Sequence, residues 1–272
     1  MKIRILSDIH IEFFPFDIPR LPDDLETVLV LAGDIGVVAD QKPLQSFLQL
    51  AATQFKAVVM VFGNHEYYRS VWPDALHDLR RWTLPDNFHV LEKSSIEIDD
   101  VVFLGATLWS DFENENPLSM MHCQRYINDF RMIGTHAKAG PYRPFSDTDC
   151  FSPKDALEEH RASCRWMADC MAEIGAAGRK MVIVTHHGVA PHSVNQKFIG
   201  SPTNGAFVSD LSELLMAGRP RLVIHGHVHD SVDYTLGDSG HPIRVIANPR
   251  GYTKKKNTQE NKCFDPMLAI EV

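Results

Sequence analysis

Residues 222–229 read LVIHGHVH and place three histidines directly after an apolar segment. The segment 222–224 has the pattern of a buried strand. Side chains two positions apart point the same way along extended backbone, so His227 and His229 can face a common point. Imidazole is a frequent metal ligand. The stretch therefore indicates a buried strand that ends at a candidate metal site.

Other parts of the chain repeat the buried-strand pattern, and helical patterns separate several of these segments. The expected strands are 3–6, 28–31, 57–62, 101–105 and 181–184. The expected helices are 43–55, 72–82 and 152–177, the last with Ser152 as its N-cap. The alternation of strands and helices predicts an α/β fold with largely parallel strand pairing.

The remaining apolar segments follow one another without helices between them. Residues 96–104 flank Asp99-Asp100 with apolar residues, a pattern typical of a hairpin. Further strands are expected at 232–236, 242–247 and 267–272. Two sheets are therefore expected within a single domain that spans residues 1–272.

Residues 111–150 form the least regular part of the sequence, with one helix-like stretch at 118–130 among several glycines, prolines and asparagines. A long irregular insertion in a compact domain is often a lid or a specificity loop. The alternative is a disordered excursion. We treat the insertion as a candidate lid.

Composition limits the classes of function. The chain of 272 residues is 44% hydrophobic, enough for a large core, and no apolar run approaches the roughly 20 residues of a membrane span. Five cysteines without a CxxC pair indicate neither a disulfide framework nor a thiolate zinc site. We expect a cytoplasmic protein without a membrane partner. The net charge of -8 argues against an extended nucleic-acid surface.

Five of the expected strands are followed by residues that can bind a metal. These residues are Asp8 and His10, Asp34, Asn64 with His65 and Glu66, His186 with His187, and the histidines that follow residue 224. Open α/β sheets bind ligands beyond the carboxyl ends of their strands, so all five clusters can meet in one pocket. Each cluster alone is a weak signal, but five in this order are not expected by chance.

The five clusters resemble the motifs of the calcineurin-like metallophosphoesterases. In this sequence the motifs are Asp8-Ile9-His10, Gly33-Asp34, Gly63-Asn64-His65-Glu66, Thr185-His186 and Gly226-His227-Val228-His229. The resemblance implies a four-layer α/β/β/α sandwich of two mixed sheets with flanking helices. It also implies a dinuclear metal centre, with Asp8, His10 and His229 on one ion, Asn64, His186 and His227 on the other, and Asp34 between them.

The chemistry of the residues agrees with two ions. Seven nitrogen and oxygen ligands are too many for one small cation, and they suit transition metals such as Mn, Fe or Zn. Two such ions could bind phosphate oxygens and activate a bridging hydroxide to attack phosphorus. The resemblance gives His65 the role of general acid toward the leaving oxygen. Which group orients His65 stays open.

Three further residues have less specific contexts. His187 could contact the substrate, although a supporting role beside His186 is favoured, and His225 is expected to pack behind the site. Arg250 could grip a substrate phosphate, because guanidinium binds phosphate in a bidentate way. The protein serine/threonine phosphatase branch carries arginines where this chain has Val38 and Phe62, so that activity is not expected.

The sequence therefore predicts a metal-dependent hydrolase that acts on a phosphomonoester or phosphodiester of a small molecule. A nuclease of the same family is one alternative, although it would need a basic track. A non-catalytic metal-binding scaffold is another, although it should have lost His65 or several ligands.

Overall fold

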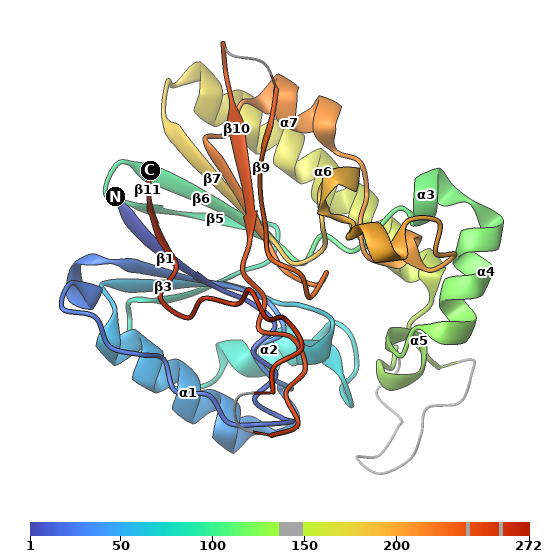
Figure 1. Ribbon diagram of the computed structural model, residues 1–272, viewed down its shortest axis with the longest axis horizontal. Helices are drawn as coiled ribbons and strands as arrows, with labels where there is room; N and C mark the ends of the chain where they lie inside the picture. Colours follow the sequence, from blue (N-terminus) through green and yellow to red (C-terminus); the bar gives the residue numbers. More distant parts are fainter. Residues whose placement is uncertain (136–148, 238–239, 256–257) are drawn as a thin grey trace.

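The computed structural model describes residues 1–135, 149–237, 240–255 and 258–272. They form two mixed sheets that pack face to face, with helices on both outer faces (Figure 1). This arrangement confirms the expected four-layer sandwich. Among the described residues, no helix is both long enough and apolar enough to cross a membrane.

The first sheet has the strand order β11-β1-β2-β3-β4. Its four parallel strands are β1 (Lys2–Leu6), β2 (Val28–Ala32), β3 (Ala57–Val61) and β4 (Phe88–Leu91). The last strand, β11 (Ala269–Glu271), pairs antiparallel with β1, so the two ends of the chain lie side by side. The amino group of Met1 donates a hydrogen bond to the carbonyl of Val272 at 2.9 Å.

The second sheet has the order β5-β6-β7-β8-β10-β9. Its parallel strands are β6 (Val101–Ala106), β7 (Lys180–Thr185), β8 (Leu222–His225) and β10 (Ile243–Ala247). The edge strands β5 (Ser94–Ile98) and β9 (Val232–Leu236) pair antiparallel with their neighbours. The hairpin expected around Asp99-Asp100 is thereby confirmed as β5 and β6.

The central core lies between the two sheets and explains the continuous apolar runs. Its members include Ile5, Val30 and Val59 from the first sheet and Phe103, Val184 and Ile224 from the second. Each of the inner parallel strands is also covered by helices on its other face, so side chains on both faces of these strands are buried.

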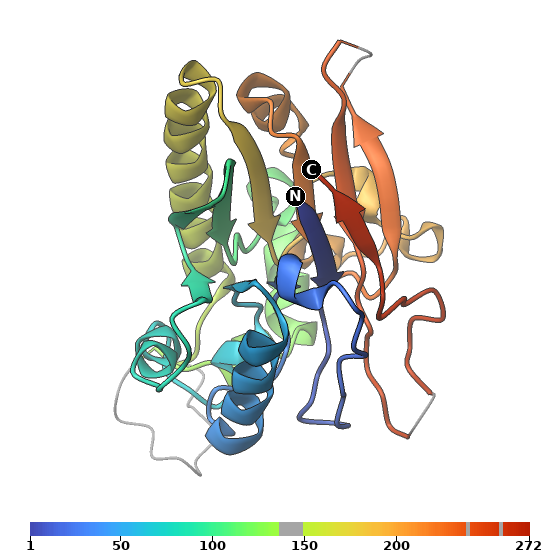
Figure 2. The same cartoon turned by 90° about the vertical axis from the view of Figure 1, so that its left-hand side faces the viewer.

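Helices cover the outer face of each sheet (Figures 1 and 2). The first sheet is covered by α1 (Gln41–Gln54) and α2 (Asp74–Arg80), and the second by α6 (Pro153–Ala176) and α7 (Ser212–Gly218). Ser152 caps α6 as expected, because its hydroxyl accepts from the amide of Asp155 while the Asp155 carboxylate accepts from the amide of Ser152. Such a cap stabilises a helix by about 1 kcal/mol.

The expectation of a single helical stretch at 118–130 in the insertion was wrong in its extent. The structure has α3 (Phe112–Glu115), α4 (Pro117–Tyr126) and α5 (Asp129–Met132). Ile127 takes an extended conformation and ends α4, and the chain bends at Ile127 and Asn128 before α5 begins at Asp129. Part of the candidate lid, residues 136–148, lies outside the described residues.

Candidate dinuclear metal centre

All five sequence clusters lie at the carboxyl ends of their strands, at one edge of the two packed sheets. Asp8 and His10 follow β1, Asp34 follows β2, Asn64 and His65 follow β3, His186 follows β7, and His227 and His229 follow β8. The structure therefore brings all seven expected ligand residues together. Six of the seven, all but His229, are buried, and His229 is mostly buried.

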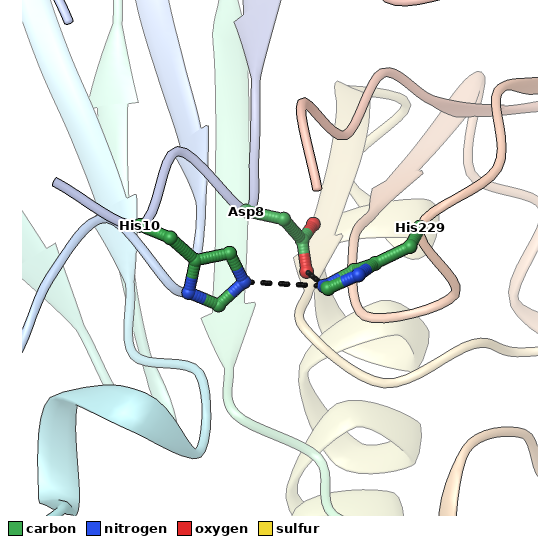
Figure 3. Close-up of side chains that lie close together, drawn as sticks. All are labelled: Asp8, His10 and His229. Carbon is green, nitrogen blue, oxygen red and sulfur yellow. Dashed lines mark hydrogen bonds and ion pairs between the residues drawn. The ribbon is translucent and has the colours of Figure 1, made fainter. Parts of the chain in front are cut away.

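The first ligand set consists of Asp8, His10 and His229 (Figure 3). His229 Nε2 lies 3.1 Å from His10 Nε2 and 3.3 Å from Asp8 Oδ1. Ligand atoms about 2.1 Å from a common ion are separated by about 3.0–3.4 Å, as in octahedral or tetrahedral coordination. The three side chains thus have the spacing of metal ligands.

The second set consists of Asn64, His186 and His227. His186 Nε2 lies 3.0 Å from Asn64 Oδ1 and 3.1 Å from His227 Nδ1. His186 Nδ1 donates to the carbonyl of Ala32 at 2.9 Å, which leaves Nε2 free to coordinate. This set also has the spacing of ligands around one ion.

Asp34 lies between the two sets. Its Oδ1 is 3.5 Å from His186 Nε2 in the second set, and its Oδ2 is 3.7 Å from His10 Nε2 in the first. One carboxylate oxygen therefore faces each set, which is one of the arrangements in which a carboxylate can bridge two ions. The donors are imidazole, carboxylate and amide groups, without thiolate, and they fit divalent transition ions.

The backbone at the site is strained. Five of the seven ligand residues have positive φ angles between 50° and 68°: Asp8, His10, Asp34, His227 and His229. The left-handed conformation costs a residue with a side chain about 1–2 kcal/mol, and such strain concentrates at functional sites. Gly226 serves a different need, since a Cβ there would lie 2.6 Å from Asp8 Oδ2. Only glycine lets β8 approach the Asp8 carboxylate this closely.

The buried carboxylates attract positive charge. Burial would raise the pKa of Asp34, but the neighbouring His186 and His65 more than offset this and hold it well below its usual value. In turn, burial would lower the pKa of His229, but its hydrogen bonds with Asp8 and Glu260 raise it to about 10. The site therefore favours cations, whether protons or metal ions.

Glu12 orients His65, which answers the question that the sequence left open. Its Oε1 accepts a hydrogen bond from His65 Nδ1 at 2.8 Å and lies 3.1 Å from His10 Nδ1. Burial would lower the pKa of His65, but Asp34 and Glu12 raise it overall. The adjacent Glu66 has another role, since its carboxylate accepts hydrogen bonds from backbone amides, among them those of Gly63 and Asp34.

His65 presents its other nitrogen to the metal site. Its Nε2 is 3.9 Å from Asp34 Oδ2 and 3.3 Å from the hydroxyl of Tyr252, and its ring stacks on Tyr68 at 4.1 Å. The His65 ring is therefore held by the hydrogen bond between Nδ1 and Glu12 and by the Tyr68 ring stacked on its face. A proton on Nε2 would point toward any group held beside Asp34.

The less specific candidates lie behind the ligands. His187 Nδ1 donates to the carbonyl of Thr107 at 3.1 Å, and its ring packs on that of His227 at 4.3 Å. His225 hydrogen-bonds to Ser193 at 2.8 Å. Arg250 is buried, and its guanidinium donates to backbone carbonyls, including that of Ile9 at 2.9 Å. None of these three lines the cavity beside the ligands.

Two supporting carboxylates come from segments outside the sequence motifs. Glu260 lies 2.7 Å from His229 Nδ1, and Asp129 Oδ1 accepts a hydrogen bond from Asn64 Nδ2 at 2.7 Å. The second bond turns the amide oxygen of Asn64 toward His186. Nothing in the sequence around Asp129 or Glu260 distinguishes them from ordinary surface residues, so only the fold reveals them.

A cavity of about 330 Å³ opens from the candidate metal centre. It extends from Asp34, Asn64 and His65 between the α4–α5 bend of the insertion and the loop that follows β7. Binding pockets for small molecules start at about this volume. The insertion therefore forms one wall of the candidate substrate site.

Comparisons with known proteins agree with this geometry. The family model described as calcineurin-like phosphoesterase matches residues 1–231. An uncharacterized protein, L509, of Acanthamoeba polyphaga mimivirus is 24% identical over 99% of this chain and 96% of its own length.

Solved structures share the fold. The phosphopantetheinyl hydrolase PptH of Mycobacterium tuberculosis has a TM-score of 0.62 at 15% identity, over 92% of this chain and 89% of its own. A putative 5'-nucleotidase of Staphylococcus aureus has a TM-score of 0.50 at 15% identity, over 90% of this chain and 48% of its own, so this chain spans about half its length. The family match covers most of the sequence, and the protein belongs to the calcineurin-like phosphoesterases.

Proposed function

We propose that this protein hydrolyses a phosphoester of a small molecule with two divalent transition ions, Mn, Fe or Zn, in the centre described above. The observation that carries the proposal is Asp34, whose two carboxylate oxygens face two separate ligand sets at 3.5 and 3.7 Å. When bound, the two ions would supply Lewis acidity toward phosphate oxygens and lower the pKa of a water molecule. A scaffold without activity would have no need for this complete set of ligands.

His65 is our candidate for the general acid. In hydrolysis, an oxygen from water bonds to phosphorus, the ester P–O bond breaks, and the leaving oxygen needs a proton. His65 Nδ1 is hydrogen-bonded to Glu12, and Nε2 lies 3.9 Å from Asp34 Oδ2. Both His65 and Asp34 line the cavity, so a proton on Nε2 is available for this step. Positioned acids of this kind contribute about 10²–10⁴-fold to rates.

The test is an assay of purified protein, with Mn²⁺, Fe²⁺ or Zn²⁺ added in turn, on p-nitrophenyl phosphate, bis-p-nitrophenyl phosphate and single-stranded DNA. We expect turnover of at least one small ester, its loss in Asp34→Asn, and a large decrease in kcat with nearly intact ion binding in His65→Ala. Cleavage of DNA alone would support the nuclease alternative. The proposal fails if no ester is cleaved with any of the three metals and no ion binds.

A further inference from the structure

The wall of the cavity carries carboxyl groups beyond those of the proposed metal ligands. Two carboxylates, Asp129 and Glu260, line it, and none of its described lining residues is lysine or arginine. Asp129 is 2% exposed and receives hydrogen bonds from Asn64 and from the hydroxyl of Tyr68, both at 2.7 Å. These two hydrogen bonds fix the position of the Asp129 carboxyl group at the cavity wall.

The nearest cations are directed elsewhere. Arg250 gives its guanidinium to the carbonyls of Ile9, Phe14 and Pro15. Lys197, next to the lining residue Phe198, lies with its ammonium 3.3 Å from Asp230. Neither side chain lines the cavity. A second phosphate or a carboxylate on the ligand would therefore find no lysine or arginine in the described lining, and it would meet Asp129, whose hydrogen-bond partners Asn64 and Tyr68 are uncharged.

The rest of the wall offers uncharged polar and aromatic groups. Tyr126 and Asn128 line the cavity from the α4–α5 bend, and Asn195 and Phe198 line it from the loop after β7. Amides and hydroxyls hydrogen-bond to neutral groups, and aromatic rings pack against apolar or planar ones. This wall suits an organic group that is polar but not anionic.

We propose that the substrate is an ester of a single phosphate whose organic part is uncharged or positively charged, and that the Asp129 and Glu260 wall rejects ligands with a further anionic group. This inference rests on the proposed function, because the metal centre must hold the phosphate. It excludes polyphosphates and nucleic-acid strands as preferred ligands.

Three phosphonates that the enzyme cannot hydrolyse would test this inference by binding alone. Phenylphosphonate, 4-carboxyphenylphosphonate and 4-(aminomethyl)phenylphosphonate share one metal-binding group and differ in the charge of the organic part. Their dissociation constants would be measured by calorimetry on the full chain loaded with Mn²⁺. We expect the carboxy compound to bind about tenfold more weakly than phenylphosphonate, from like charges at a partly screened distance, and the aminomethyl compound to bind at least as tightly.

A variant at the wall provides the matched control. Asn128 is exposed, and its side chain does not cap α5. Asn128→Lys should improve binding of the carboxy compound about threefold, the range of an exposed ion pair, while Asn128→Met, of similar length without charge, should not.

The possible outcomes separate the inference from the proposed function. Equal or tighter binding of the carboxy compound to the unmodified protein would overturn the inference and leave the hydrolase proposal standing. Binding with the expected ranking but no ester turnover would support the charge selectivity and contradict the hydrolase. If none of the three phosphonates binds to ion-loaded protein, both proposals are wrong.

Discussion

Glu12 Oε1 lies 2.8 Å from His65 Nδ1 and 3.1 Å from His10 Nδ1. One largely buried carboxylate therefore contacts both the candidate acid and a candidate metal ligand. Burial would raise the pKa of Glu12, but the hydrogen bonds with the two histidines lower it overall, so the carboxylate is charged at neutral pH. A charged partner at Nδ1 fixes the ring orientation and keeps the proton of Nε2 on the side of the cavity.

Replacement of Glu12 tests this arrangement. Glu12→Gln should lower kcat about 10- to 100-fold, the usual effect of removing a carboxylate behind a functional histidine, with a smaller change in KM. His65→Ala should lower kcat further, and the double variant should be no slower than His65→Ala, because Glu12 acts through His65. Additive losses in the double variant would show that Glu12 acts independently of His65.

Asp129 is predicted to support the second metal ion through Asn64. Asp129→Ala frees the amide of Asn64 to rotate, and we expect about 10- to 100-fold weaker binding of that ion. Asp129→Asn keeps an oxygen that can accept from Asn64 Nδ2, so it should recover part of the affinity. Ion binding would be followed by calorimetry with Mn²⁺. Unchanged binding in Asp129→Ala would contradict the role of the insertion in the metal centre.

Gly226→Ala tests the close approach between β8 and Asp8. The added methyl group would lie 2.6 Å from Asp8 Oδ2 and 2.8 Å from the carbonyl of Ala32, so the ligand loop must move. We expect destabilisation of about 1–3 kcal/mol, as for overpacking, and weakened ion binding.

Gly175→Ala provides the matched control, because Gly175 lies within α6 and a Cβ there would lie 4.0 Å from Met181 Cε. It should raise the free energy of unfolding by about 0.4–1 kcal/mol. Both variants would be measured by urea unfolding monitored by circular dichroism. An equal effect of the two changes would show that the approach to Asp8 is not tight.

The cysteines should differ in their reactivity toward a thiolate-directed reagent such as iodoacetamide. Burial raises the pKa of Cys123 to about 11 and that of Cys164 to about 12, whereas Cys263 is exposed. At pH 8 the two raised thiols are almost entirely protonated, so Cys263 should be alkylated first. The alkylation rates of Cys123 and Cys164 should rise as the pH approaches 11. Mass spectrometry of digests would give the order, and fast labelling of Cys164 at pH 8 would be the wrong result.

Local sequence was enough to predict most of the strands and the candidate ligand residues that the structure brings together after them. Each candidate ligand comes directly after an apolar run, so chain order and sheet edge together specify where Asp8, Asn64 or His227 must lie. β4 was missed because its residues are only partly buried and FHVL lacks a continuous apolar pattern. The break of α4 at Ile127 was missed because the apolar spacing continues across it to Phe130.

Supporting contacts were beyond the reach of the sequence because they join distant segments. Glu12 contacts His65 across 53 positions, and Asp129 contacts Asn64 across 65. Arg250 shows a second limit of prediction from sequence. Its residue type suggested a phosphate contact, but its guanidinium donates to the backbone carbonyls of Ile9 and Pro15. Residue type and spacing do not determine where a long side chain turns.

Ion stoichiometry measured together with activity tests the dinuclear phosphoesterase most directly. The protein would be dialysed against Mn²⁺, its metal content determined by plasma mass spectrometry, and hydrolysis of both p-nitrophenyl esters assayed on the same sample. We predict about two ions per chain with active hydrolysis, since two metals acting together is the common arrangement for such sites, and loss of both properties in Asp34→Asn. Chains that bind no ion, or an Asp34→Asn variant that keeps both ions and full activity, would contradict the account.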